Sequence, residues 1–300
     1  MDSSDAASLW SSTNQQAPAC MNAEIVHNCP ACLSDEHRQV ALPDLNVCKN
    51  CSLYFRTPRP TQAAILKSYE SGLTFSRWQD ELPARTFLWE KRLQLILRHM
   101  QSGNLLDIGT GDGFFLQFAK RHFDTQATEI SKTGVRQAQA HGHRVHHGQL
   151  ADFPDRYQNF DVITLWHVLE HVPAPRLLMK DIRHRLTPNG IVAVAIPNEL
   201  TPILRDRVKR TRKSPAERHS LGQLAFGEEI HLTHFTPAVF KAFLRQLGFR
   251  ILDFGIDDVH VDRPARKVAK YHINRAINAA CKVHFDSAMY AICSPAPLAG

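Results

Sequence analysis

The chain has 300 residues, of which 43% are hydrophobic and 22% are charged. These fractions lie close to the averages for globular proteins, so they exclude a mostly disordered chain, a collagen and a coiled coil. The formal net charge is +7, and most of the excess lies in residues 204–219, where seven Lys and Arg stand against two acidic residues. No apolar run is long enough to span a membrane, so we expect no transmembrane helix.

The N-terminal residues 1–24 are polar and lack both a basic start and an apolar core. This predicts a disordered leader rather than a secretory signal. The chain holds seven cysteines. Without a signal, an odd number of cysteines favours free thiols and metal ligands over disulfides. We therefore expect a reducing, cytoplasmic location.

Residues 25–60 contain two Cys-x-x-Cys pairs, Cys29 with Cys32 and Cys48 with Cys51, and fifteen residues separate the pairs. That spacing suits four thiolates around a tetrahedral Zn²⁺ ion. Such a site has no open position, so the zinc would be structural. A segment with so few apolar residues also needs a metal in order to fold. The pattern predicts a zinc ribbon over 25–60.

A helical linker or lid is predicted for 61–103, where apolar residues recur at helical spacing. Residues 104–300 then alternate short apolar runs with helix-length segments, apart from a basic insert at 199–230. This alternation indicates a doubly wound, mostly parallel α/β sheet. The runs expected as strands are 105–109, 125–130, 143–147, 160–166, 190–197, 249–256 and 288–293.

Two helix boundaries are marked in this part of the chain. Proline and glycine in 186–190 predict the end of one helix before the strand at 190–197. Thr236 followed by Pro237 predicts the start of a later helix, which Gly248 ends.

The sharpest motif follows the first predicted strand. Asp107 ends that strand, and Gly109, Gly111 and Gly113 follow at alternate positions before an apolar helix begins at Phe114. Glycines there let the backbone turn tightly and let a ligand lie against it. A dinucleotide site needs its third glycine where Phe114 stands, and a P-loop needs a Gly-Lys pair that is absent. A plain strand–turn–helix junction is the remaining alternative.

The motif Asp-x-Gly-x-Gly-x-Gly resembles motif I of the class I S-adenosylmethionine-dependent methyltransferases. Together with FDVITLWHVLEHV, RLTPNGIVAVAIPN and HLTHFTPAVFKAFLRQLGF, it is similar to the ubiquinone-type branch over residues 84–256. The resemblance implies a seven-stranded sheet with an antiparallel last strand, and S-adenosylmethionine (SAM) as cofactor. The cofactor-binding residues that it implies are Asp107, Gly109, Gly111 and Gly113 for the methionine part, Glu129 for the ribose, Gln149 and Leu150 for the adenine, and Trp166.

Three histidines are candidates for catalysis. We expect residues 167–171 to begin the helix after the strand at 160–166. His167, Glu170 and His171 are spaced i, i+3, i+4, so on that helix they would share a face. In the ubiquinone O-methyltransferases the matching segment reads acid-x-x-Glu-His and holds a divalent metal, whereas here His167 replaces the first acid. A metal site, a base and a support for loops around the cofactor all remain open for this group. His231 matches a recurrent His-Leu-x-x-Phe-Thr, which implies either a general base or a histidine that holds a lid loop.

The acceptor expected is a small metabolite, such as a sugar or a phosphorylated conjugate, methylated on oxygen or carbon. An RNA substrate is an alternative, but residues 204–224 contain no aromatic side chain to stack on bases. A peripheral-membrane lipid or quinone methyltransferase is another, because residues 264–282 read as a basic amphipathic helix. A module that binds cofactor without turnover completes the alternatives. The oligomeric state stays open.

Overall fold

The computed structural model describes residues 23–40, 44–70, 82–154, 158–200, 231–257 and 287–296, with isolated positions between 273 and 280. Nearly all of the predicted leader, of the basic insert and of the basic helix lies outside these residues.

The largest element is a seven-stranded sheet in the order β12-β13-β10-β9-β6-β7-β8. All pairings in it are parallel except those of β13, which runs antiparallel to both β10 and β12. The predicted doubly wound, mostly parallel sheet is thus confirmed, as is its antiparallel last strand. The strands are β6 (Gly103–Ile108), β7 (Phe123–Glu129), β8 (Val145–His147), β9 (Phe160–Trp166), β10 (Leu186–Pro197), β12 (Phe249–Ile256) and β13 (Ala288–Pro295).

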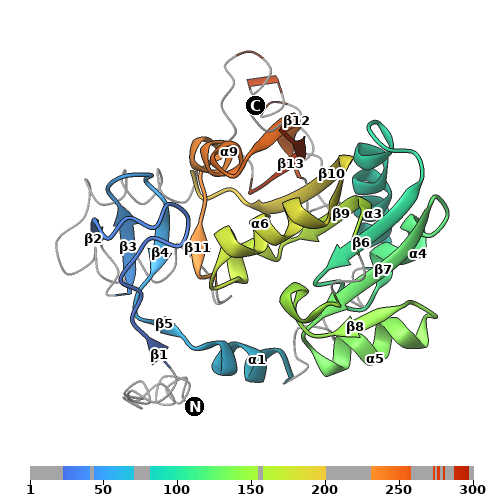
Figure 1. Ribbon diagram of the computed structural model, residues 1–300, viewed down its shortest axis with the longest axis horizontal. Coiled ribbons are helices and arrows are strands. Elements are labelled where there is room, and N and C mark those ends of the chain that lie inside the picture. The colour runs from blue at the N-terminus through green and yellow to red at the C-terminus, as the bar shows by residue number, and fades with distance from the viewer. Residues whose placement is uncertain are drawn as a thin grey trace, which may run out of the picture.

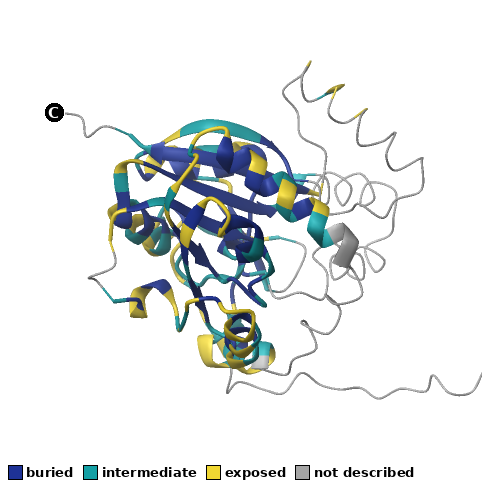
Figure 2. Ribbon diagram, turned by 90° about the vertical axis from the view of Figure 1, so that its right-hand side faces the viewer, coloured by how far each residue is buried: buried dark blue, intermediate teal, exposed yellow. Residues whose placement is uncertain are grey.

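Helices cover both faces of this sheet, and the burial pattern shows why. The middle strands β9 and β10 are buried almost throughout, because alternate side chains enter two separate apolar clusters. One cluster holds α3 and α4, and the other holds α6 and α9. Figure 2 shows the buried sheet beneath helices that expose one side. The helices are α1 (Gln62–Glu70), α3 (Leu82–Leu97), α4 (Phe114–Ala119), α5 (Lys132–Ala140), α6 (Pro175–Arg185) and α9 (Pro237–Gln246), with single 3-10 turns η1 (Leu150–Asp152) and η2 (Leu169–His171).

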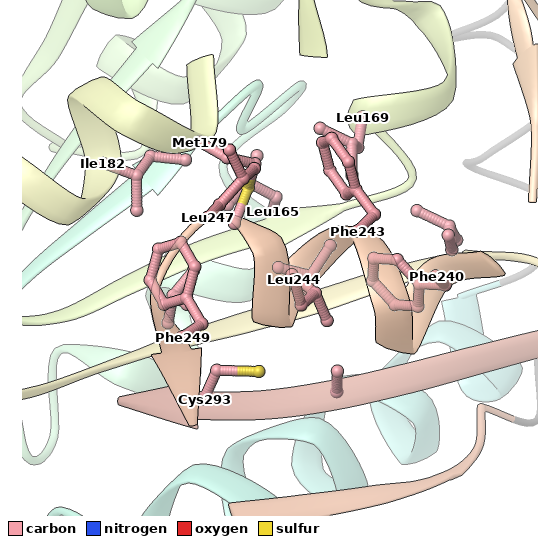
Figure 3. Packing of buried hydrophobic residues seen from close by; sticks show 14 of the residues in the cluster. Leu165, Leu169, Met179, Ile182, Phe240, Phe243, Leu244, Leu247, Phe249 and Cys293 are labelled. Carbon is pink, nitrogen blue, oxygen red and sulfur yellow. The ribbon is translucent and has the colours of Figure 1, made fainter. Parts of the chain in front are cut away.

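Helix α9 forms as its capping residues predict. The Thr236 side chain accepts the backbone N–H of Val239 at 3.4 Å, and Pro237 occupies the first turn. Gly248 follows the helix with φ +76°, a conformation that favours glycine. The apolar face of the helix, including Phe243, packs against α6 and the sheet (Figure 3).

Two local expectations differ from the structure. Residues 186–190 belong to strand β10, since Leu186 already pairs with Phe160 and the register then shifts before Ile191. The expected turn is therefore an irregularity inside a strand. Residues 167–171 do not begin an α-helix. His167 has φ +58°, and only the 3-10 turn η2 follows.

A second sheet joins the cysteine-rich segment to the large sheet. Its order is β11-β4-β3-β2, and the short strand β11 (Thr233–His234) comes from the chain just before α9. Figure 1 shows β11 beside the N-terminal strands. Phe55 of β4 packs in the same apolar cluster as Phe235 and Phe240. The N-terminal strands are β1 (Ala23–Glu24), β2 (His37–Gln39), β3 (Leu45–Cys48), β4 (Tyr54–Arg56) and β5 (Arg59–Pro60), of which β1 pairs with β5.

Among the described residues, no helix has the length and apolar composition needed to cross a lipid bilayer.

Candidate functional site

The glycine loop connects β6 to α4 at the carboxyl edge of the parallel strands. Gly109, Gly111 and Gly113 all have positive φ, between 61° and 76°, a region that costs other residues free energy. A Cβ on Gly109 would stand 2.6 Å from the Val168 side chain, and one on Gly113 would stand 2.8 Å from the Cβ of Ala138. The loop is therefore closed to larger side chains, and its backbone is left to contact a ligand.

Asp107 lies directly before this loop and is almost completely buried. Its Oδ1 accepts the Thr164 hydroxyl at 2.6 Å, across the β6–β9 pairing. Burial raises the pKa of Asp107 to about 7, despite the opposing hydrogen bond from Thr164. A cationic group beside this carboxyl would lower its pKa and favour the charged carboxylate, which would in turn attract the cation.

Glu129 ends β7, one strand along from the glycine loop. Its Oε2 accepts the N–H of Gly111 at 2.7 Å, and its Oε1 accepts the N–H of Ser131 at 2.8 Å. Each oxygen of a carboxylate can accept a further hydrogen bond, so Glu129 shapes the loop and still offers acceptors to a diol. Burial is the largest influence on the carboxyl and raises its pKa, while the Ser131 and Gly111 N–H groups lower it.

The other predicted cofactor residues occupy different environments. Gln149 is exposed and precedes η1, where its N–H donates to Asp152 Oδ2 at 3.0 Å. The Leu150 side chain is 2% exposed and lies in the core, so Leu150 can offer a ligand only its backbone. Trp166 ends β9 and packs edge-on against Phe115. Its indole N–H has no hydrogen-bond partner among the described residues.

A buried charge network lies next to Trp166. The Arg92 guanidinium sits over the rings of Trp89 and Trp166, at 4.6 and 4.7 Å from their centroids. It also forms a two-pronged ion pair with Asp257, just beyond β12. Both side chains are at most 2% exposed. Burial alone would raise the pKa of Asp257, but Arg92 and His167 hold it well below its usual value.

His167 is held between two carboxylates. Its Nδ1 lies 3.3 Å from Glu170 Oε1 and its Nε2 lies 3.5 Å from Asp257 Oδ2. Burial would lower the pKa of His167, but the two carboxylates outweigh burial and raise it. Since both ring nitrogens face acids, the protonated imidazolium is the favoured form. This geometry suits a charged support for Glu170 better than a proton acceptor.

Of the three predicted catalytic histidines, His171 and His231 are the two whose rings are in contact. Their ring centroids are 4.9 Å apart in an edge-on arrangement, although the residues come from different segments. Tyr69 of α1 lies edge-on to His171 at 6.2 Å. Glu170 supports this pair from within the protein: it is 1% exposed, and its Oε1 lies 4.0 Å from His171 Nε2.

Two acids and a histidine of this region were not predicted from the sequence. Glu199 follows β10, and its Oε1 accepts His234 Nδ1 at 3.2 Å. Burial would raise the pKa of Glu199, but His231 and His234 lower it to about 2. Asp257 and Glu199, like Glu129, lie at or just past the end of a strand of the large sheet. That shared position was the available signal, because the ligand edge of such sheets lies there.

Three groups of described residues place possible metal ligands within 4.8 Å of one another. The first is the four predicted cysteines, where the Sγ atoms of Cys29 and Cys51, and of Cys32 and Cys48, are 3.5 Å apart. Cysteine sulfur atoms around one Zn²⁺ ion are separated by similar distances, so these residues fit zinc. The other two groups are Glu170, His171 and His231, and Glu199, His231 and His234.

Glu170, His171 and His231 have the ligand chemistry of a divalent transition metal. This set takes His231 in place of His167, which was the expected third member. Glu170 is already close to His167 and His171, and His231 is close to Glu199. The charges of this cluster are therefore balanced within the protein, and the arrangement does not require a metal ion.

The sheet order, the single antiparallel strand and the glycine loop after the first strand define the class I methyltransferase fold. The chain matches the family of methyltransferase domains over residues 78–253, and it belongs to that family.

Solved methyltransferases share this fold at low sequence identity. Magnesium protoporphyrin IX methyltransferase from Synechocystis PCC 6803, solved with S-adenosylhomocysteine (SAH), has a TM-score of 0.53 at 12% identity and covers 79% of this chain and 100% of its own. A Haloferax volcanii methyltransferase in complex with the Trm112 activator has a TM-score of 0.52 at 15% identity, over 76% of this chain and 97% of its own. At these sequence identities the similarity shows a shared fold and nothing about the substrate.

One curated relative is an uncharacterized protein of Methanocaldococcus jannaschii. It is 25% identical over 122 residues, which is 41% of this chain and 57% of the relative. The chain therefore matches little more than half of that protein's length.

Proposed function

We propose that the protein transfers the methyl group of SAM to an oxygen or carbon atom of a small metabolite. Membership of the methyltransferase domain family supports methyl transfer. The observation that carries the proposal further is the meeting of His171 and His231, each next to a buried carboxylate, near the edge of the sheet where the glycine loop lies.

The methionine and ribose parts of the cofactor would be held at the carboxyl ends of two adjacent strands, β6 and β7. Glycine-loop N–H groups and the Asp107 carboxyl suit the methionine part, whose ammonium would stabilise the buried acid. Glu129 keeps acceptor capacity for the ribose hydroxyls. When bound, SAM supplies an electrophilic methyl group on a sulfonium. The protein's part is to hold the acceptor in line and to exclude water.

An oxygen or carbon acceptor must lose a proton as the methyl group arrives. We assign that proton to a ring nitrogen of the His171–His231 pair, since neutral imidazole accepts protons near neutral pH. The acceptor atom forms its bond to the methyl carbon while the methyl–sulfur bond breaks, and the electron pair of the broken bond stays on sulfur, which leaves SAH. The electrons of the O–H or C–H bond remain with the acceptor, and the imidazole that takes the proton becomes cationic. Glu170 and Glu199 stabilise that cation. His167 takes no proton in this scheme.

Labelling with methyl-tritiated SAM and fractionated cell extract tests the acceptor class. We expect label in water-soluble metabolites, such as a sugar or a phosphorylated conjugate. Label in RNA would identify an RNA methyltransferase, and label in the lipid fraction would identify a lipid or quinone acceptor. SAH binding without transfer to any fraction would identify a binding module. Each of these last three results would overturn the proposal.

We also propose a structural role for zinc at the four cysteines. The ion would be held by thiolates alone and would have no position open to a substrate. In the structure the thiol of Cys51 lies against Cys29 and lowers the pKa of Cys29 to about 5, so one thiolate is favoured before any ion arrives.

A further inference from the structure

We propose that Glu199 is a positioning residue for His231: it keeps Nδ1 of that ring turned inward and protonated, and so leaves Nε2 as the atom that accepts the proton. This inference rests on the function proposed above and adds a residue to its proton-transfer step. Glu199 does not touch the reacting atoms.

The backbone of Glu199 is fixed at the end of β10. Its N–H donates to the Phe235 carbonyl at 3.0 Å, and the N–H of the preceding Asn198 donates to Ser287 at 2.9 Å. The residue is 5% exposed. The carboxylate therefore approaches the histidines from inside the protein, opposite to the solvent.

Glu199 faces both histidines of this segment through the same oxygen. Its Oε1 is 3.2 Å from His234 Nδ1, a hydrogen bond, and 3.9 Å from His231 Nδ1. The distance to His231 Nδ1 is within ion-pair range but too long for a hydrogen bond. Hydrogen bonds of catalytic groups are often long before substrate binds. A carboxylate next to Nδ1 favours the tautomer with hydrogen on Nδ1, which makes Nε2 the basic atom.

His234 prevents the carboxylate from turning away. Its ring is completely buried, and burial, which outweighs the effect of Glu199, lowers its pKa. A neutral His234 that donates from Nδ1 holds Oε1 in place. Since His234 lies on β11, the position of Glu199 is coupled to the sheet that β11 shares with the cysteine-rich segment.

The main chain of His231 is held from two sides. Its carbonyl accepts Arg56 Nε at 2.9 Å, and the N–H of the next residue, Leu232, donates to the Glu170 carbonyl at 2.8 Å. The Arg56 N–H also donates to the Leu232 carbonyl at 3.0 Å. With the backbone fixed, the orientation of the His231 ring depends on the side chains around it. Glu199 lies 3.9 Å from Nδ1, and Glu170 and His171 also lie within 4.8 Å of a ring nitrogen of His231.

The decisive variant is Glu199→Gln, which keeps the size of the side chain and removes its charge. We expect kcat for the acceptor found by labelling to fall about tenfold or more, the loss of one acid–base contribution. KM for the acceptor and Kd for SAH should stay within about twofold, because Glu199 touches neither. Asp181→Asn is the matched control: that acid pairs with Arg185 on α6, and its variant should keep wild-type kcat.

A second measurement needs no acceptor. In protein labelled with ¹⁵N-histidine and saturated with SAH, the His231 signals, assigned with His231→Gln, should show hydrogen on Nδ1, and in Glu199→Gln the population should shift toward the Nε2–H form. A wild-type ring already protonated at Nε2, or an unchanged kcat in a folded variant, would overturn the inference. A second bound metal lost in Glu199→Gln would also overturn it, by making Glu199 a ligand. If extract labelling fails while the expected tautomer is seen, the proposed function fails, and Glu199 sets the tautomer of His231 without serving that reaction.

Discussion

Glu129 Oε2 accepts the backbone N–H of Gly111 at 2.7 Å, so the acid at the end of β7 fixes the glycine loop that follows β6. The residue expected to hold the ribose therefore also sets the conformation of the loop expected to hold the methionine part. One side chain thus couples both halves of the proposed cofactor site through contacts within the protein.

Glu129→Gln tests this coupling. One carboxylate oxygen becomes an NH₂ group that faces the N–H of Gly111 or Ser131, two donors in contact. A hydrogen bond to a charged group is worth about 1.5–3 kcal/mol, so we expect Kd for SAH, measured by calorimetry, to rise about tenfold or more. Asp124→Asn, on the same strand in an exposed ion pair with Arg144, should leave Kd within about twofold. An unchanged Kd in Glu129→Gln would exclude the ribose role.

Gly113→Ala and Gly142→Ala separate two costs of replacing a glycine. Both positions have positive φ, +76° and +79°, but a Cβ on Gly113 meets the Ala138 Cβ at 2.8 Å whereas one on Gly142 has nothing within 4 Å. The backbone conformation costs about 1–2 kcal/mol in either variant, and overpacking adds about 1–3 kcal/mol at Gly113 alone. Denaturant unfolding should show Gly113→Ala as the less stable variant. Equal losses of unfolding free energy in the two variants would mean that the glycine loop shifts to make room for the Cβ at position 113.

Local patterns predicted most of the large sheet. Most strands of that sheet carry an apolar run, and the spacing of the three glycines marks the loop after β6. The carboxyl edge of the sheet and the position of Glu129 at that edge therefore followed from the sequence. The helix at 237–246 followed from its cap. These features depend on residues close together in the chain.

The parts that could not be predicted depend on distant contacts. The left-handed φ of His167 replaces the expected helix, and the donation of its N–H to the Ala195 carbonyl depends on a neighbouring strand. The pairing of β11 with β4 joins segments about 180 residues apart. Glu199 lies beside His231 and His234 through another contact between separate segments, the donation of its N–H to the Phe235 carbonyl. Neighbouring residues carry no signal for which distant segment a strand or side chain will meet.

Removing one partner of the buried pair Arg92–Asp257 should lower the free energy of unfolding strongly, whereas replacing both partners by uncharged residues should lower it much less. Arg92→Met leaves the Asp257 charge buried with only His167 near it, and such losses cost about 3–5 kcal/mol. Adding Asp257→Asn should recover much of the stability, because no uncompensated charge remains. Arg98→Met is the control, since Arg98 is 64% exposed in its pair with Asp253, and exposed pairs contribute at most about 1 kcal/mol. Urea unfolding of the four proteins checks the order; a double variant no more stable than Arg92→Met would contradict it.

Zinc should be present at one ion per chain and should be lost in Cys48→Ser. Structural zinc sites contribute on the order of 10 kcal/mol to the folding of their segment, so the variant should unfold at a lower temperature. Because β4 pairs with β11, methyl transfer should fall while Kd for SAH changes little. Cys293→Ala, which removes a buried thiol of β13, should retain its zinc. Full zinc in Cys48→Ser, measured by atomic emission, would contradict the four-thiolate site.

Glu199 should contribute stability that depends on pH in a defined window. Its pKa is about 2 in the folded protein against the ordinary 4.5, so the native state binds the proton less readily than the unfolded chain. A depressed carboxyl pKa stabilises the fold above pH 4.5, and the contribution disappears as pH falls toward 2. Its full size, from the difference between these pKa values, is of order 3 kcal/mol.

The difference in unfolding free energy between wild type and Glu199→Gln isolates this contribution from Asp257 and Glu170, whose pKa values are also lowered. We expect the difference to be constant from pH 7 to about pH 5 and to shrink below that, when measured by urea unfolding at each pH. A difference that stays the same down to pH 3 would show that the Glu199 carboxylate is not stabilised by His231 and His234. The Glu199 contribution must disappear on acidification, because protonation removes the negative charge that faces the His231 and His234 rings.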